Sequence, residues 1–206
     1  MRSVICFIDD SDFEHNLVRY EIAPFSADFL FVYARDFEEA RRLLASKSPA
    51  LFLLDLWGQD EEIMAPRITS EEELRSKVMD FPTLDGVYSG LADFQGDKTN
   101  EYLKRLFSIV NNWRGLFEEV CSRAGQNRKY GLHNITQARL FYPGVPAVFY
   151  TRKSLISDAV AMFRAHADGL LIKPTGCNDQ DTKRLTREYG PQLLKDLTEI
   201  ILSTQT

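Results

Sequence analysis

The sequence predicts an α/β protein with a doubly wound, parallel five-stranded sheet and a mostly helical insertion. Two observations lead to this fold class. Five short apolar runs have the length of strands that are buried on both faces, and amphipathic helical segments separate them. The alternation stops over residues 58–143, where no comparable apolar run occurs. The composition agrees, because 44% hydrophobic and 27% charged residues are typical of a globular chain.

Residues 1–57 are predicted to contain three strands and two helices. The strands are the apolar runs at residues 4–8, 29–33 and 50–54. Ser11 or Asp12 can cap the first helix and Asp36 the second, because their side-chain oxygens can accept hydrogen bonds from free N–H groups of the first turn. Strands that alternate with helices indicate βαβ units and therefore a parallel sheet.

Residues 58–143 are predicted to form the insertion between the third and fourth strands. Ser70, followed by three glutamates, is typical of a capped helix start, whereas residues 81–96 indicate a loop. Apolar residues at three- and four-residue steps predict a long helix over residues 97–124. Its apolar stripe consists of Leu103, Leu106, Phe107, Val110, Trp113, Phe117, Val120 and Cys121. We expect this stripe to pack against the other helix of the insertion; a surface for a partner or a second copy is the alternative.

Residues 144–206 return to the α/β pattern. The remaining strands are predicted at residues 145–150 and 169–172. A helix is expected over residues 154–166, and a last amphipathic helix over residues 181–202. Together with residues 1–57, this part completes one α/β domain into which the remainder of the chain is inserted.

Charge and cysteine content narrow the functional classes. A net charge of −5 and a pI of about 5.3 argue against a general nucleic-acid binder. Three cysteines without a CxxC motif indicate free thiols of a reducing compartment. The first apolar run meets Asp9 after five residues, too soon for a signal peptide or a membrane span. We therefore expect a cytoplasmic protein that does not contact a membrane.

The polar residues that follow the predicted strands are the candidate functional residues, because open parallel sheets bind ligands at the carboxyl ends of their strands. Asp9 and Asp10 follow the first strand, Asp55 the third, Thr151 the fourth and Lys173 the fifth. Three carboxylates at one edge repel each other unless a divalent cation such as Mg²⁺ joins them. A hydroxyl and an ammonium group beside them can hold a phosphoryl group.

This set of residues resembles the signature of the response-regulator receiver domains of two-component signalling. Asp55 follows Asp10 by 45 positions, and Lys173 follows Thr151 by 22, as is usual in that family. The stretch over residues 167–174 is also similar to the fifth-strand pattern of the family. The resemblance covers residues 1–57 and 144–206. It implies a flavodoxin-like fold with strand order 2-1-3-4-5.

The resemblance implies a stand-alone receiver of a phosphorelay that accepts a phosphoryl group on Asp55. Thr151 would bind a phosphoryl oxygen, and Lys173 would pair with Asp55 or its phosphate. The implied Mg²⁺ ligands are Asp9, Asp10, Asp55 and the backbone carbonyl of Trp57. The implied partners are a histidine kinase or phosphotransfer protein and an output protein, for which the insertion is the candidate binding surface. At most self-dephosphorylation is implied as enzymatic activity.

The sequence also departs from the receiver pattern. Leu170 stands where the family usually has Tyr or Phe. Arg152 directly follows Thr151, at a position where the family usually has a small residue. Arg152 could crowd the phosphate pocket or supply a further cation. Two other functions stay open. One is a receiver-shaped binding module that works without phosphorylation. The other is a haloacid-dehalogenase-type phosphatase with Asp10 as nucleophile and Asp12 as acid/base, in which Asp55 would have no role.

Overall fold

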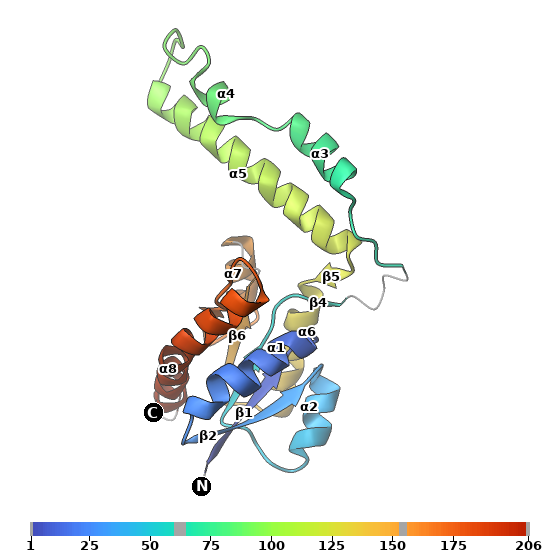
Figure 1. Cartoon of the computed structure of the whole chain (residues 1–206). Coiled ribbons are helices and arrows are strands. Elements are labelled where there is room, and N and C mark those ends of the chain that lie inside the picture. The colour runs from blue at the N-terminus through green and yellow to red at the C-terminus, as the bar shows by residue number, and fades with distance from the viewer. Residues whose placement is uncertain (1, 60–64, 153–155, 205–206) are drawn as a thin grey trace. The chain divides into compact units, whose positions relative to one another are not determined.

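The computed structural model describes residues 2–59, 65–152 and 156–204 (Figure 1). The chain forms two compact units. The larger unit comprises residues 1–60 and 127–206, and the smaller unit comprises residues 61–126. In the described part of the chain, no helix is both long and apolar enough to cross a membrane.

The larger unit is built on a parallel sheet with the strand order β2-β1-β3-β6-β7. Its strands are β1 (Ser3–Ile8), β2 (Phe29–Ala34), β3 (Leu51–Leu54), β6 (Ala147–Thr151) and β7 (Gly169–Ile172). Ile8 pairs with Leu54, and Thr151 pairs with Ile172, so the carboxyl ends of neighbouring strands lie level with each other. The predicted fold class and the strand order 2-1-3-4-5 are confirmed.

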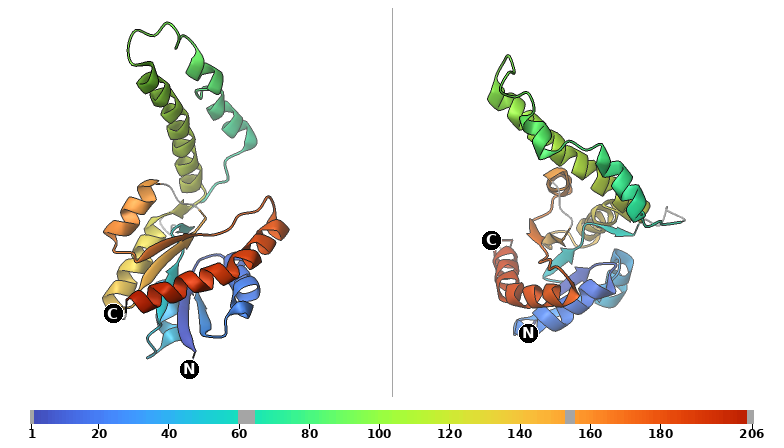
Figure 2. Two further views of the ribbon diagram at one scale, coloured as in Figure 1. Left: turned by 90° about the vertical axis from the view of Figure 1, so that its left-hand side faces the viewer. Right: turned by 45° about the horizontal axis from the view of Figure 1, so that its top comes forward.

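Helices cover both faces of this sheet, as Figure 2 shows for α8 on one of them. They are α1 (Asp12–Leu17), the π-helical turn η1 (Val18–Ile22), the 3₁₀ turn η2 (Ala23–Phe25), α2 (Phe37–Leu44), α6 (Lys129–Phe141), α7 (Ile156–Arg164) and α8 (Asp179–Ser203). The predicted helix start at Ser154 lies outside the described residues. All four residues of β3 are buried, because this central strand is covered on both sides.

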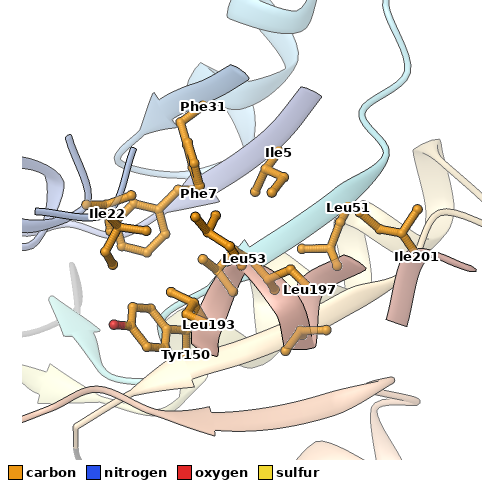
Figure 3. Packing of buried hydrophobic residues seen from close by; sticks show 13 residues of the cluster. Ile5, Phe7, Ile22, Phe31, Leu51, Leu53, Tyr150, Leu193, Leu197 and Ile201 are labelled. Atoms are coloured by element: carbon orange, nitrogen blue, oxygen red, sulfur yellow. The ribbon is translucent and has the colours of Figure 1, made fainter. Parts of the chain in front are cut away.

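On one face, alternate strand residues pack against η1 and α8 (Figure 3). The side chains that meet there include Ile5, Phe7, Leu51, Leu53, Val148, Tyr150, Val18, Ile22, Leu193 and Leu197. Helix α8 continues through Pro191, beside Gly190, at which a Cβ atom would lie 3.2 Å from the Phe25 ring. The close approach of α8 to η2 therefore depends on a glycine at this position.

The other face is covered by α2 and α6. The rings of Phe37 and Tyr142 lie against Phe52 of β3, with centroid distances of 6.3 and 5.3 Å. The buried residues of α6 are Gly131, Asn134, Ile135 and Ala138. The predicted insertion at residues 58–143 therefore needs a correction: residues 127–143 belong to the larger unit, because α6 supplies the cover that this face of the sheet requires.

The smaller unit contains α3 (Glu71–Met79), α4 (Leu84–Tyr88) and α5 (Lys98–Arg123). Ser70 and Glu73 form the capping box at the start of α3. The predicted loop at residues 81–96 contains α4, whose first turn is capped by Thr83. Two short strands, β4 (Gly58–Gln59) and β5 (Gln126–Asn127), form a separate two-stranded sheet.

The apolar stripe of α5 does not form the core that we predicted. Four of its residues are between 45% and 63% exposed, namely Leu103, Phe107, Val110 and Trp113. The buried residues of α5 are Leu116 and Cys121. The reason lies in α3, which has no buried residue and instead pairs Lys77 with Glu119 at 2.7 Å. An ion pair rather than a buried apolar residue of α3 therefore links α3 to α5.

Candidate functional site

The sheet brings the predicted site residues to one edge. Backbone hydrogen bonds continue the strand pairing by one residue beyond β1, β3 and β7. The Asp9 N–H donates to Ala34 O at 3.0 Å, the Asp55 N–H to Ile8 O at 2.9 Å, and the Lys173 N–H to Thr151 O at 3.0 Å. These bonds fix the backbone from which the carboxylates and the lysine extend into the site.

Lys173 is the centre of a buried ion cluster. Its Nζ atom lies 2.5 Å from Oδ2 of Asp9 and 3.0 Å from Oδ1 of Asp55. Glu14 of α1 joins the cluster, with its Oε2 atom 3.6 Å from the same nitrogen. The Lys173 side chain is only 3% exposed, so water screens these charges weakly. The structure therefore brings together three of the predicted residues, Asp9, Asp55 and Lys173.

The charges in this cluster shift each other's pKa values. Burial raises the pKa of Asp9; Lys173 opposes that shift, while Asp55 adds to it. Burial lowers the pKa of Lys173, but the carboxylates of Asp55, Asp9 and Glu14 outweigh it and hold this pKa above its usual value. Lys173 is therefore held in its charged form and faces the carboxyl groups of Asp9, Asp55 and Glu14.

Thr151 contributes a buried hydroxyl group to this edge of the sheet. The residue is 1% exposed at the end of β6, and its Oγ1 atom makes no hydrogen bond to the described residues. Leaving a buried polar group unpaired costs about 1–3 kcal/mol. A group kept at that cost next to a buried lysine fits the binding of a ligand oxygen.

Asp10 has a different hydrogen-bond partner from the other carboxylates. Its Oδ2 atom accepts from the Gln59 N–H at 2.7 Å, whereas Asp9 and Asp55 bond to Lys173. Within the described residues, no three Asp, Glu, His or Cys side chains converge as ligands of one metal ion. The predicted oxygen donors have the chemistry that Mg²⁺ prefers, but in this arrangement Asp10 is turned to the backbone of β4. Trp57, the fourth predicted ligand, is 4% exposed.

Arg152 and Glu14 form a pair that sequence reasoning did not find. Arg152 Nε lies 2.8 Å from Oε1 of Glu14, and Nη2 lies 3.3 Å from Oε2. Arg152 Nη1 also donates to the Pro174 carbonyl and, at 3.1 Å, to Oγ1 of Thr175. The guanidinium group thus joins α1 to the segment after β7. The position of Arg152 was visible in the sequence, but nothing there indicated Glu14 as its partner.

Tyr130 is a second residue that the sequence did not indicate. Burial raises the pKa of Tyr130, and the negative charges of Asp9, Asp10 and Asp55 add to that shift. Its hydroxyl donates to the Arg35 carbonyl. Sequence reasoning placed this residue in the insertion, whereas it belongs to the first turn of α6.

Asp12 does not take the position that the phosphatase hypothesis needs. Its carboxylate pairs with Arg35 at 2.6 Å and is 71% exposed. Asp10 bonds to Gln59 instead, and the buried cluster contains Asp55, for which that hypothesis has no role. The geometry gives no support to an Asp10–Asp12 nucleophile and acid/base pair.

Comparison with known proteins supports the fold. No protein-family model matches the sequence, and no curated protein matches it. The response regulator domain of CheB from Thermotoga maritima is 12% identical, with a TM-score of 0.51 over 98% of this chain and 97% of that chain. The signal receiver domain of an HD domain-containing protein from Pseudomonas fluorescens Pf-5 is 13% identical, with a TM-score of 0.50 over 100% and 98%. The chain therefore has the fold of response-regulator receiver domains.

Proposed function

We propose that this protein is a phosphorelay receiver that accepts a phosphoryl group on Asp55 with the help of Mg²⁺. One observation carries the proposal. Lys173 bonds to both Asp9 and Asp55, and the neighbouring strand ends in the buried hydroxyl of Thr151, which has no hydrogen-bond partner among the described residues. A nucleophilic carboxylate, an ammonium group and a free hydroxyl are the groups that a transferred phosphoryl requires.

Each residue has a distinct task in this proposal. Asp55 supplies the oxygen that forms the bond to phosphorus, while the donor's leaving group departs on the opposite side. Lys173 and Thr151 bind the equatorial phosphoryl oxygens. A cation held by Asp9, Asp10, Asp55 and the Trp57 carbonyl would neutralise charge on the incoming group. The acyl phosphate adds roughly −1.5 to −2 charges at Asp55, which suffices to reorient neighbouring groups.

The partners follow from the same chemistry. A phosphohistidine of a histidine kinase or phosphotransfer protein is the proposed donor. Output is proposed to occur through protein contacts, with the smaller unit as the candidate surface, since the exposed apolar residues of α5 lie there. The proposed compartment is the cytoplasm.

The test is covalent phosphorylation in vitro. The full chain is incubated with Mg²⁺ and acetyl phosphate, and intact mass and peptide mapping locate the added phosphate. Wild type should gain one phosphoryl group on Asp55, Asp55→Ala none, and Asp10→Asn much less. Phosphate on another residue, or none on the folded wild type, would contradict the proposal. Phosphate ester turnover that survives Asp55→Ala but is lost in Asp10→Asn would favour a phosphatase.

One observation favours the second candidate, a binding module that works without phosphorylation. Asp10 is bonded to the Gln59 amide, and the described residues hold no convergent set of metal ligands. In that case the beryllofluoride mimic of the phosphoryl group should neither bind nor alter the protein, and partner binding should be equal for wild type and Asp55→Ala.

A further inference from the structure

The segment of β4, which lies between Asp55 and the smaller unit in the sequence, is hydrogen-bonded to Asp10. The Gln59 N–H donates to Oδ2 of Asp10 at 2.7 Å. This bond holds the Asp10 carboxylate in one orientation, and with that orientation no three acidic side chains of the described residues converge as ligands of one metal ion. Oδ2 of Asp10 is thus bonded to the backbone of β4, whereas Asp9 and Asp55 bond to Lys173.

The same segment is fastened on its other side by Tyr130. The ring lies directly on Gly58, where a Cβ atom would come within 2.4 Å of Cγ of Tyr130. The Tyr130 hydroxyl donates to the Arg35 carbonyl, and the next residue, Gly131, donates its N–H to Leu56 O at 3.0 Å. Tyr130 and Gly131 of α6 therefore hold the backbone on the N-terminal side of Gln59, at Leu56 and Gly58.

We propose that Gln59 and Tyr130 form a latch: the Gln59 N–H withholds Asp10 from the cation site, and the Tyr130 ring holds the segment of β4 in place. Release of β4 from these contacts raises the affinity of the site for a divalent cation. The inference rests on the proposed function and deepens it by assigning two positioning residues that lie outside the ligand set. The latch links the insertion to the site through the chain itself, since β4 directly precedes the smaller unit. A partner that binds the insertion and displaces β4 would therefore strengthen cation binding. Because thermodynamic coupling is reciprocal, the bound cation would strengthen partner binding by the same factor.

The first test measures Mn²⁺ affinity of the full chain by electron paramagnetic resonance, without a phosphodonor. Tyr130→Ala removes the ring from Gly58, and Gly58→Ala displaces it from the other side. Both variants should bind Mn²⁺ about tenfold more tightly or better, which corresponds to releasing a hydrogen bond to a charged group. Tyr20→Ala, which removes a 63% exposed tyrosine of η1, is the matched control and should keep the wild-type affinity.

The second test follows the latch itself. Amide hydrogen exchange of Gln59, measured by NMR, should be slow in wild type, faster in saturating Mg²⁺, and fast in Tyr130→Ala with or without Mg²⁺. A role of Tyr130 in stability alone would not make the exchange of this amide depend on Mg²⁺. Urea unfolding curves show whether each variant remains folded.

The outcomes separate the latch from the proposed function. If the folded variants bind Mn²⁺ no more tightly than wild type, Asp10 serves the cation with its other oxygen and the latch is overturned, although Asp55 can still be phosphorylated. If Mn²⁺ binds more tightly in the variants but Asp55 gains no phosphate, the latch stands and the phosphorelay proposal fails. Equal Mn²⁺ binding by Tyr130→Ala and by the double variant Tyr130→Ala/Asp10→Asn overturns the latch and the proposed ligand set together.

Discussion

Lys173 and its carboxylate partners lie in a part of the molecule that water hardly reaches. A buried ion pair adds little net stability, because the loss of hydration offsets the attraction between the charges. Removing one partner is nevertheless destabilising by about 3–5 kcal/mol, since it leaves an uncompensated buried charge. The cluster is therefore better explained by the proposed phosphoryl transfer at Asp55 than by a gain in stability.

His15 of α1 makes the stability of the larger unit depend on pH. The side chain is 7% exposed, and its Nε2 atom lies 3.2 Å from the Ala34 carbonyl. Burial lowers the pKa of His15, only partly opposed by this backbone contact. The unfolded chain takes up a proton near the ordinary pKa of about 6.5, whereas the folded chain does so only at lower pH. Stability should therefore fall as the pH drops below about 6.5.

Urea unfolding between pH 7.5 and 5 measures this dependence. His15→Gln keeps a hydrogen-bond donor but cannot be protonated, so the free energy of unfolding should fall less steeply over this range than in wild type. His133→Gln, on an exposed position of α6, is the control and should retain the wild-type slope. An unchanged slope in His15→Gln would show that other groups cause the acid sensitivity.

At the scale of elements, α6 packs closely against the end of β3 because residue 131 is a glycine. A Cβ atom on Gly131 would lie 2.5 Å from the Asp55 carbonyl oxygen and 2.6 Å from Cα of Leu56. Backbone atoms cannot move aside as the end of a side chain can. The first turn of α6 therefore fixes the position of the segment that carries the proposed phosphoacceptor.

Glycine-to-alanine substitutions at two positions should have opposite effects on the free energy of unfolding. Gly131→Ala forces α6 away from β3 and should lower the free energy of unfolding by about 1–3 kcal/mol. Gly115→Ala, in the middle of α5 with no atom within 4 Å of the new Cβ, should raise it by about 0.5–1 kcal/mol. Thermal unfolding followed by circular dichroism measures both. A neutral Gly131→Ala would mean that α6 is not tightly seated.

The sequence predicted best those elements whose apolar pattern is strong. The five strands could be recognised because their apolar runs are continuous, and the proximity of Asp55 to Lys173 followed from their places at strand ends. Helix α6 was not predicted, and its residues were placed in the insertion, because its buried residues include Gly131 and Asn134 and only one large apolar residue, Ile135. The bond from Gln59 to Asp10 could not be predicted, since a backbone N–H is common to almost every residue and leaves no signature in the sequence.

At the scale of the whole molecule, the larger unit contains every part of a receiver fold without the insertion. Its sheet, both layers of helices and the ion cluster lie within residues 1–60 and 127–206. Replacing residues 61–126 by a short glycine-serine linker should therefore leave a folded protein. Circular dichroism should show the α/β spectrum, and urea unfolding should be cooperative. Aggregation, or unfolding without a cooperative transition, would show that the smaller unit is needed for folding.

The position of the insertion also affects how quickly the sheet can assemble. Paired residues of β3 and β6 are 95 positions apart, and the 66 residues of the smaller unit lie between them. If the smaller unit folds first, the loop to be closed shortens to about 30 residues, which lowers the entropic barrier by about 1 kcal/mol. Refolding of the whole chain should then slow down when helix α5 is weakened, whereas the shortened chain has no such dependence. An element outside the sheet would in this way set the rate at which the two halves of the sheet join.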